Sequence, residues 1–349
     1  MLAEEPVDVR RPTIADVAKR AGVSKGLVSF VFNDKPGVAA PTRERILAAA
    51  AELGWQPDQL ARSLSTQQAA SLGLVVRRDP TVLAADPFFP AFMAGVETAL
   101  TERGWVLVLS LVPDADAEAA TYRSLAAHRR VDGVLLTDLR RDDERLPLLA
   151  GLGLPAVCVG RPDAPAGFPV VNLDDAAGLR AVVEHLVGLG HRRIGYVGGD
   201  VGMLHGLRRR ATFRAALAGH GLEPVGLVDT DFSAAAGAAA TTALLDAPER
   251  PTALVYASDP MAVAGLAVLQ RRGLRVPQDC SVTGFDGMEL GAHLHPALTT
   301  VGADPLAWGR AAAGVLLRLL DDGRAEDLEL PAAALLVRSS TGPPPDPPA

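Results

Sequence analysis

Near the amino-terminal end, apolar residues recur every three or four positions, which predicts short helices with one apolar face. The first helix follows Thr13, which can cap it, and Asp16 completes a capping-box-like start. Gly22 ends this helix in a tight turn, and Ser24 can cap a second one. The apolar positions of the two helices are Ile14, Val17, Ala18 and Ala21, then Leu27, Val28, Val31 and Phe32. Such a pair is typical of a helix-turn-helix, whose second helix enters the DNA major groove.

A third helix and a short connecting segment follow. Helical spacing predicts the third helix from Thr42 to Leu53, before Gly54. Its expected inward positions are Ile46, Leu47, Ala50 and Leu53. We expect Trp55 to pack beneath these helices rather than to stack on a base. Residues 57–66 could form about two helical turns, which is marginal for an isolated helix. This segment is either a plain linker or a hinge that folds only against a second copy and DNA.

From residue 71 onward, short apolar runs alternate with amphipathic stretches of helical length. The runs typical of buried strands are 72–76, 106–111, 133–136, 156–159, 194–197, 227–229, 253–256, 281–285 and 335–337. This alternation predicts parallel sheets covered by helices on both faces. Two successive sets of strands indicate two doubly wound subdomains rather than one oversized sheet.

The charge is divided unevenly along the 349 residues. The formal net charge is −7, yet residues 10–66 carry nine Lys and Arg against five Asp and Glu, or +4. The remainder therefore carries −11. A basic head on an acidic body suits a protein whose head alone meets phosphate.

Motifs of other protein classes are absent from the sequence or poor. No apolar run is long enough to cross a membrane, and the acidic start lacks the apolar segment of a secretory signal, so we expect a cytoplasmic protein without a membrane partner. The seven histidines lack metal-binding spacing, and no nucleophile elbow or nucleotide fingerprint occurs. We therefore expect no catalytic residue, no metal and no cofactor. Cys158 and Cys280 lie beside strand-like runs and are expected to be buried free thiols.

Several runs of residues occur in the order that a known family shows. In the head they are Thr13-Ile-Ala-Asp-Val-Ala, Ala21-Gly-Val-Ser, Val28-Ser, Asn33 and Leu53-Gly with Pro57. Farther on they are Asp86-Pro-Phe-Phe, Asp132-Gly-Val, Asp174-Asp175 with Gly178, Gly190-His191 with Ile194, Ser258-Asp259, Gly284-Phe285-Asp286 and Pro296-Ala-Leu-Thr-Thr-Val. By these runs the chain resembles the LacI/GalR (lactose repressor) family of bacterial transcription regulators over nearly its whole length.

The resemblance implies a domain organisation. A disordered arm (1–11) would precede an all-α helix-turn-helix DNA-binding domain (12–56) and a hinge helix with linker (57–70). The effector-binding and dimerisation core (71–341) would look like a periplasmic sugar-binding protein, with two doubly wound parallel-sheet subdomains joined by three crossovers. Its N-subdomain would hold about 71–170 and 299–322, and its C-subdomain about 171–298 and 323–341. A disordered tail (342–349) would end the chain.

The resemblance also implies DNA-binding residues. Base contacts would come from the first turns of the second helix, where Lys25 can donate to guanine and Gly26 can only allow close approach. Phe30 could meet a thymine methyl group, or it could pack in the head. Phosphate contacts would come from Ser24, Ser29 and Asn33. Thr13 is expected among the DNA-binding residues as well.

Leu64 is a separate expectation drawn from the resemblance. A family leucine at this place in the hinge helix wedges into the minor groove and kinks the duplex. The alternative is that Leu64 packs on its own subunit.

The effector cleft would lie between the subdomains at the carboxyl ends of their strands. Its expected residues are Phe88 or Phe89, Asp138, Arg209, Phe232, Ser258 and Asp286. Carboxylates and an arginine suit vicinal hydroxyl groups, and an aromatic wall suits the apolar face of a sugar. The two phenylalanines could instead belong to the core, and Arg209 could be part of a surface charge run.

The function implied is a homodimeric transcriptional regulator, expected to act as a repressor, that binds a pseudo-palindromic operator in double-stranded DNA under allosteric control of a small effector. That effector would be a carbohydrate, with a nucleoside as the alternative. A sugar-active cytosolic enzyme and a solute-binding protein on the same core fold are the alternatives.

Overall fold

The computed structural model describes residues 12–32, 35–56, 68–165 and 167–346. The chain divides into two compact units, Met1–Ala69 and Ala70–Ala349. The predicted arm, hinge helix and last residues (1–11, 57–67 and 347–349) lie outside the described residues.

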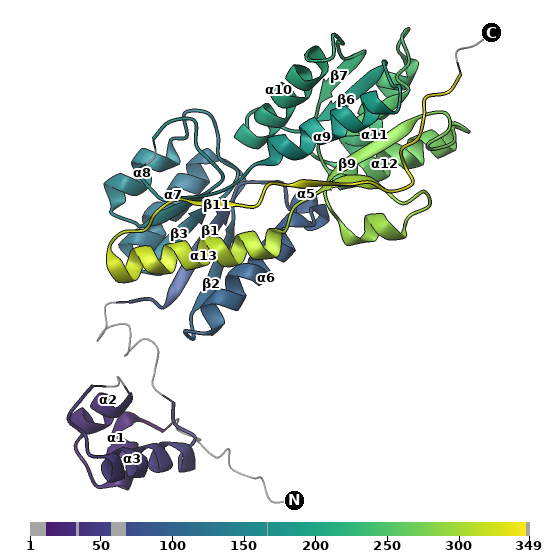
Figure 1. Ribbon diagram of the computed structural model, residues 1–349. Coiled ribbons are helices and arrows are strands. Elements are labelled where there is room, and N and C mark those ends of the chain that lie inside the picture. Colours follow the sequence, from purple (N-terminus) through teal and green to yellow (C-terminus); the bar gives the residue numbers. More distant parts are fainter. Residues whose placement is uncertain (1–11, 33–34, 57–67, 166, 347–349) are drawn as a thin grey trace, which may run out of the picture. The chain divides into compact units, whose positions relative to one another are not determined.

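The first unit is a small three-helix domain of α1 (Ile14–Ala21), α2 (Lys25–Phe32) and α3 (Ala40–Glu52) (Figure 1). Asp16 accepts hydrogen bonds from the backbone N–H and the hydroxyl of Thr13, at 2.8 and 2.6 Å, which fixes the start of α1. Gly22 ends α1 with φ of 65°, a left-handed conformation that favours glycine. The predicted helix-turn-helix is thus present.

The core of this unit holds apolar residues from all three helices. Trp55 packs edge-on against Phe32 with ring centroids 5.0 Å apart, so its predicted structural role is confirmed. The prediction for Leu47 was wrong, because its side chain is 43% exposed. Ala49 is buried instead, since the inward positions of α3 are Ile46, Ala49 and Ala50.

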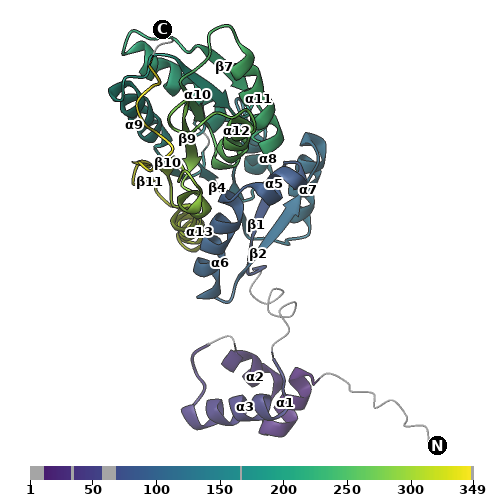
Figure 2. The ribbon, with the colours of Figure 1, turned by 90° about the vertical axis from the view of Figure 1, so that its right-hand side faces the viewer.

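The second unit contains two six-stranded sheets, each flanked by helices on both faces (Figures 1 and 2). The first sheet has the order β11-β5-β4-β3-β1-β2, and every pair in it is parallel. Its strands are β1 (Ser71–Val76), β2 (Val106–Leu111), β3 (Gly133–Leu136), β4 (Ala156–Val159), β5 (Val170–Leu173) and β11 (Leu328–Leu330). One apolar cluster joins it to α6 (Phe88–Thr101) and α13 (Pro305–Asp322), and another to α7 (Ala115–Ala127) and α8 (Arg145–Leu152).

The second sheet has the order β12-β10-β9-β8-β6-β7, with only the β10–β12 pair antiparallel among its described strands. Its strands are β6 (Ile194–Gly198), β7 (Gly226–Asp229), β8 (Ala253–Tyr256), β9 (Ser281–Asp286), β10 (Thr299–Gly302) and β12 (Ala334–Leu336). The remaining helices are α5 (Pro80–Ala85), α9 (Asp175–Gly188), α10 (Leu204–Ala218), α11 (Ala234–Asp246), α12 (Asp259–Arg271) and the 3-10 helix η1 (Glu289–His293). The fold therefore agrees with the two doubly wound subdomains expected from the sequence.

The expected subdomain bounds are wrong at the places where the chain crosses between sheets. Thr299–Gly302 was expected in the N-subdomain, but β10 pairs in parallel with β9 of the second sheet. Leu328–Leu330 was expected in the C-subdomain, but β11 pairs with β5 of the first sheet. The strand β5 itself extends to Leu173, beyond the expected subdomain bound at residue 170. The chain thus passes between the sheets three times: after β5, before α13 and after β11.

Both cysteines, Cys158 and Cys280, are buried and free, as predicted. Among the described residues, no helix is both long and apolar enough to cross a membrane.

Candidate functional site

A cavity of about 340 Å³ opens at the carboxyl ends of the strands of both sheets. Six residues expected in the effector cleft line it: Phe88, Asp138, Arg209, Phe232, Ser258 and Asp286. They come from segments spread over some 200 positions of sequence, which the two sheets bring to one place. We call this space the effector cavity.

Phe89, the remaining candidate, does not line the cavity and is 1% exposed. Neighbouring residues of a helix point about 100° apart, so only one of the two can face the cavity. Phe88 takes that position, with its ring edge-on to Trp308 at 5.8 Å, and Phe89 belongs to the core of the first subdomain. The expectation for Phe89 is therefore wrong.

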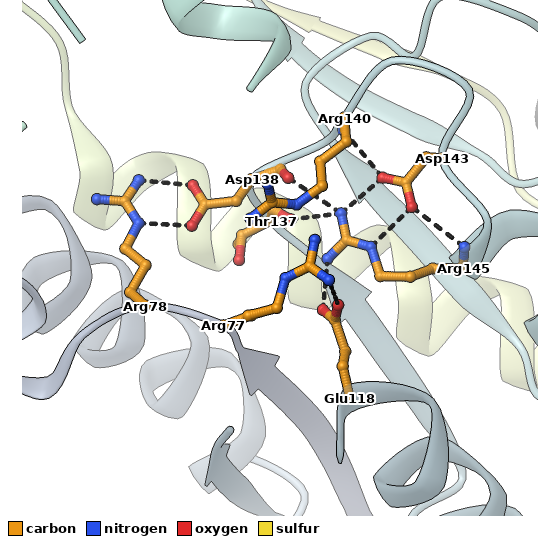
Figure 3. Close-up of polar contacts among 8 residues, drawn as sticks. All are labelled: Arg77, Arg78, Glu118, Thr137, Asp138, Arg140, Asp143 and Arg145. Carbon is orange, nitrogen blue, oxygen red and sulfur yellow. Dashed lines mark hydrogen bonds and ion pairs between the residues drawn. The ribbon is translucent and has the colours of Figure 1, made fainter. Parts of the chain in front are cut away.

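Arg78 follows β1 and holds Asp138 in a two-point ion pair (Figure 3). Its Nε and one terminal nitrogen lie 2.6 and 2.7 Å from the two oxygens of Asp138, and its other nitrogen lies 2.9 Å from Asp86. Burial alone would raise the pKa of Asp138, but the charge of Arg78 outweighs it and lowers this pKa to about 2. Asp138 is therefore a charged acceptor at neutral pH.

Arg209 is fixed on the other side of the cavity by the second subdomain. Its Nε donates to Asp175 at 2.9 Å, and a terminal nitrogen donates to the carbonyl of Ala257 at 2.9 Å. The guanidinium also lies 3.6 Å above the ring of Phe285. With a side chain only 12% exposed, Arg209 is part of the cavity wall and not of a surface charge run.

Asp286 ends β9 with a strained φ of 119°, which turns the chain at the cavity. One of its oxygens lies 3.9 Å from Arg209, a long separation for an ion pair. Burial raises the pKa of Asp286 well above its usual range, against the opposing charge of Arg209. Its carboxyl group is thus less readily ionised than that of Asp138, and the protonated form can donate a hydrogen bond.

Two buried hydroxyl groups on the cavity wall, those of Ser258 and Thr137, lack a hydrogen-bond partner within the described part of the chain. A buried hydroxyl without a partner is unfavourable, and most native ones are satisfied by protein or by a bound molecule. The two groups therefore offer donors and acceptors to a polar ligand.

The ring of Phe232 stacks on His205, with centroids 5.2 Å apart and planes inclined by 27°. Phe232 adopts φ of 68°, and its ring is so close to Gly199 that an added Cβ there would approach within 1.9 Å. Burial, helped by the charge of Arg209, lowers the pKa of His205 to about 3, so this imidazole is neutral. The pair supplies a flat wall without net charge.

In the first unit, α2 exposes the three residues expected to read bases, Lys25, Gly26 and Phe30. Phe30 is 44% exposed, so it does not pack in the core of the head, and the ammonium of Lys35 lies 5.4 Å from its ring centroid. An added Cβ at Gly26 would meet nothing closer than the hydroxyl of Ser24 at 3.8 Å. Packing within the head therefore does not require glycine at this position.

The phosphate candidates differ in their surroundings. The hydroxyl of Ser24 accepts from the backbone N–H of Leu27 at 3.2 Å and so caps α2. Ser29 is half-buried on α2, and Thr13 is bonded to Asp16 at the start of α1. Asn33 and Leu64 lie outside the described residues, so their expected DNA contacts stay predictions.

Several cavity residues escaped the sequence analysis, including Arg78, Thr137, Asp175, His205 and Trp308. Thr137 directly follows β3, and Arg78 lies two positions after the end of β1. The candidates Asp138 and Asp286 also lie at or just beyond the ends of strands, so the rule that sites lie at carboxyl strand ends could have found Arg78 and Thr137 too. Trp308 gives no such signal, because it lies on α13, whose packing on the first sheet the sequence does not specify.

The sequence matches two known families. Residues 13–58 match the bacterial regulatory proteins of the lacI family, and residues 183–341 match the periplasmic binding protein-like domain. The HTH-type transcriptional regulator CelR of Thermobifida fusca is 37% identical over 339 residues, covering 95% of this chain and 98% of CelR. The HTH-type transcriptional repressor CytR of Escherichia coli (strain K12) is 30% identical, covering 94% and 96%.

Solved structures agree with these matches. The complex of CelR with cellobiose is similar with a TM-score of 0.72 at 35% identity, covering 95% of this chain and all of that one. The lac repressor dimer bound to operator and the anti-inducer ONPF has a TM-score of 0.85 at 28% identity, with the same coverage. With its helix-turn-helix head and two-sheet core, this chain belongs to the LacI family of bacterial transcriptional regulators.

Proposed function

We propose that this regulator is a homodimeric repressor that binds a pseudo-palindromic operator and is controlled by a sugar in the effector cavity. The observation that carries the proposal is the cavity wall itself. It combines charged carboxylate–arginine pairs, two hydroxyl groups that have no partner among the described residues, and aromatic rings from both subdomains. Polar groups that can exchange several hydrogen bonds, beside flat apolar rings, suit a molecule with many hydroxyl groups and an apolar face.

The roles of individual residues belong to this proposal. Asp138, Arg209, Ser258 and Asp286 would bind hydroxyl groups, and Phe88 and Phe232 would cover the apolar face of a ring. A volume of about 340 Å³ suits a sugar of one or two rings. CelR has been solved with cellobiose, which makes glucose disaccharides the first candidates.

On the DNA side, we propose that α2 enters the major groove, with Lys25 donating to guanine and exposed Phe30 against a thymine methyl group. Ser24, Ser29, Thr13 and Asn33 would hold phosphates, and Leu64 would open the minor groove. The domain bounds proposed for this role are 12–56 for the DNA-binding domain and 57–70 for the hinge. Two heads related by a two-fold axis would read the two half-sites.

Control would come from a change in the closure of the two subdomains when the effector binds. An effector shifts operator affinity only if it binds one closure state better than the other. Coupling of about 1–3 kcal/mol changes operator affinity roughly 5–150-fold. A regulator of this kind works in the cytoplasm, where bacterial DNA lies.

Turnover of a sugar would distinguish the alternative, a sugar-active enzyme, from a protein that only binds the sugar. The purified protein is incubated with cellobiose and other glucosides, and the sugars are then analysed for cleavage or modification. We expect them to be recovered unchanged, and a product formed in proportion to the protein would favour the enzyme.

The effector is found by calorimetric titration of the full chain with a panel of sugars and nucleosides, repeated with Arg209→Gln. We expect at least one sugar to bind and this variant to bind it more weakly. If only nucleosides bind, or if a sugar binds the variant equally well, the proposed sugar site is wrong.

A further inference from the structure

A second cavity, of about 510 Å³, lies where α7, α8 and the loop after β3 meet on one side of the first sheet. It shares no lining residue with the effector cavity. Five arginines line it, from four segments of the chain: Arg77, Arg123, Arg140, Arg141 and Arg145. Four acids line it as well: Glu118, Asp142, Asp143 and Glu144. We call it the arginine cavity.

The two buried acids of this cavity are already engaged (Figure 3). Arg145 holds Asp143 through two nitrogens at 2.8 and 2.7 Å, and it donates to Glu118 at 3.1 Å. The second oxygen of Glu118 lies 3.4 Å from Arg77. The side chains of Arg145, Glu118 and Asp143 are 8% exposed or less, so this network is fixed.

Arg140 is different, because its guanidinium has no hydrogen bond or ion pair to any residue that the structure describes. Only its backbone N–H is engaged, donating to Asp143 at 3.0 Å. Burial lowers the pKa of Arg140, and the charges of Arg77 and Arg145 lower it further. The arginine is half-buried, with two other arginines among its charged neighbours.

Two acids outside the cavity, Asp138 and Asp200, attract Arg140, but they offset burial and the neighbouring cations only in part. Asp138 uses both oxygens for Arg78 on the far side of the loop (Figure 3). Asp200 accepts from the backbone N–H of Gly202 at 2.7 Å. The exposed acids of the cavity wall, Asp142 and Glu144, form no ion pair with Arg140 either. Within the described part of the chain, the guanidinium of Arg140 thus has no direct acidic partner.

We propose that the arginine cavity binds a phosphate-type oxyanion, held by Arg140 together with Arg77 and the exposed Arg123. Planar guanidinium groups bind phosphate oxygens through short, charge-assisted hydrogen bonds. An anion beside Arg140 would also offset the repulsion among the neighbouring guanidinium groups. Inorganic phosphate and the phosphate group of a small metabolite share this chemistry, and the cavity has room for either.

The test is calorimetric titration of the full chain with inorganic phosphate and, separately, with glycerol phosphate at constant ionic strength. We expect saturable binding of one or both, weakened roughly tenfold in Arg140→Gln, which removes one charged donor. The matched control is Arg214→Gln, which removes the same charge from an exposed position on α10 and should bind like the unaltered protein. The tighter of the two ligands identifies the form that the site prefers.

Three results would overturn the proposal: no phosphate-dependent heat, equal binding by Arg140→Gln, or equal losses in both variants, which would indicate a general charge effect. Circular dichroism establishes that each variant is folded. If Arg140→Gln fails to fold, Arg123→Gln replaces it, since Arg123 is exposed on α7 and outside the buried network. Undiminished phosphate binding by that variant would contradict the proposal in the same way.

Discussion

The unpartnered hydroxyl groups of the second unit allow a residue-level test of the effector cavity. Thr137 and Thr283 both carry a buried hydroxyl without a partner among the described residues, but only Thr137 lines the cavity. Thr137→Val removes the hydroxyl and keeps the shape of the side chain. We expect effector affinity to fall about 2- to 12-fold, the loss of one neutral hydrogen bond, with stability unchanged or slightly higher. Calorimetric titration and urea unfolding measure the two effects.

Thr283→Val is the matched control, because it removes an equivalent hydroxyl from β9 away from the cavity. Its effector affinity should equal that of the unaltered protein. Equal affinities for both variants would mean that the hydroxyl of Thr137 does not contact the effector.

His205 gives a pH dependence whose sign follows from its pKa. Its folded-state pKa of about 3 lies below the unfolded value of about 6.5, so the unfolded chain binds the proton more tightly. The stabilising contribution of neutral His205 is therefore complete above pH 6.5 and is lost as the pH falls toward 3. The expected slope is roughly 1.4 kcal/mol per pH unit between these limits.

Urea unfolding of the protein and of His205→Gln at pH 7, 6 and 5 measures this slope. Burial also lowers the pKa values of His185 and His191, so the unaltered protein should lose further stability from them. His205→Gln should retain only the pH dependence of stability that comes from His185 and His191. Identical slopes would contradict a buried, neutral His205.

At the scale of elements, the contact between α6 and α13 depends on two glycines. An added Cβ at Gly309 would lie 2.0 Å from the carbonyl oxygen of Phe92, and one at Gly95 would lie 2.0 Å from that of Leu306. Gly309→Ala must therefore separate the helices, and we expect it to lower the free energy of unfolding by about 1–3 kcal/mol. Urea unfolding of the full chain measures the change.

Gly314→Ala on the same helix is the control, because its added Cβ would meet only the flexible end of Arg318, at 3.7 Å. Alanine is the better helix former, so this variant should be more stable by about 0.5–1 kcal/mol. Changes of opposite sign in the free energy of unfolding of the two variants would establish the close contact between α6 and α13, whereas equal changes would argue against it.

The role of α2 as the reading helix is tested by Lys25→Ala. Loss of a base-edge contact should weaken binding to the specific operator by about 1–3 kcal/mol and relax sequence preference at one position. Lys19→Ala, which removes the same charge from an exposed position on α1, separates base reading from loss of charge. Fluorescence anisotropy at fixed salt is the measurement. If both variants lost specific and non-specific binding in the same proportion, Lys25 would contact only phosphate.

At the scale of the whole molecule, periodicity alone predicted the helix-turn-helix head and the two doubly wound subdomains. Assignment of β10 to a sheet was not predictable in this way, because a buried run of four residues looks the same in either sheet. The cavity was predictable where a polar residue follows a strand, as at Asp138 and Asp286. The pairing of Arg78 with Asp138 was not predictable, because the two residues lie 60 positions apart and only the folded sheet brings them together.

The central claim is that a sugar in the effector cavity changes how the chain binds its operator. The most direct measurement is operator affinity of the full chain by fluorescence anisotropy, with and without a saturating sugar already shown to bind by calorimetry. Asp138→Asn, which weakens the Arg78 pair in the cavity wall, is measured in parallel. We predict that the sugar changes the operator affinity of the unaltered protein roughly 5- to 150-fold and that of the variant much less. The same operator affinity with the cavity filled and empty would contradict the account.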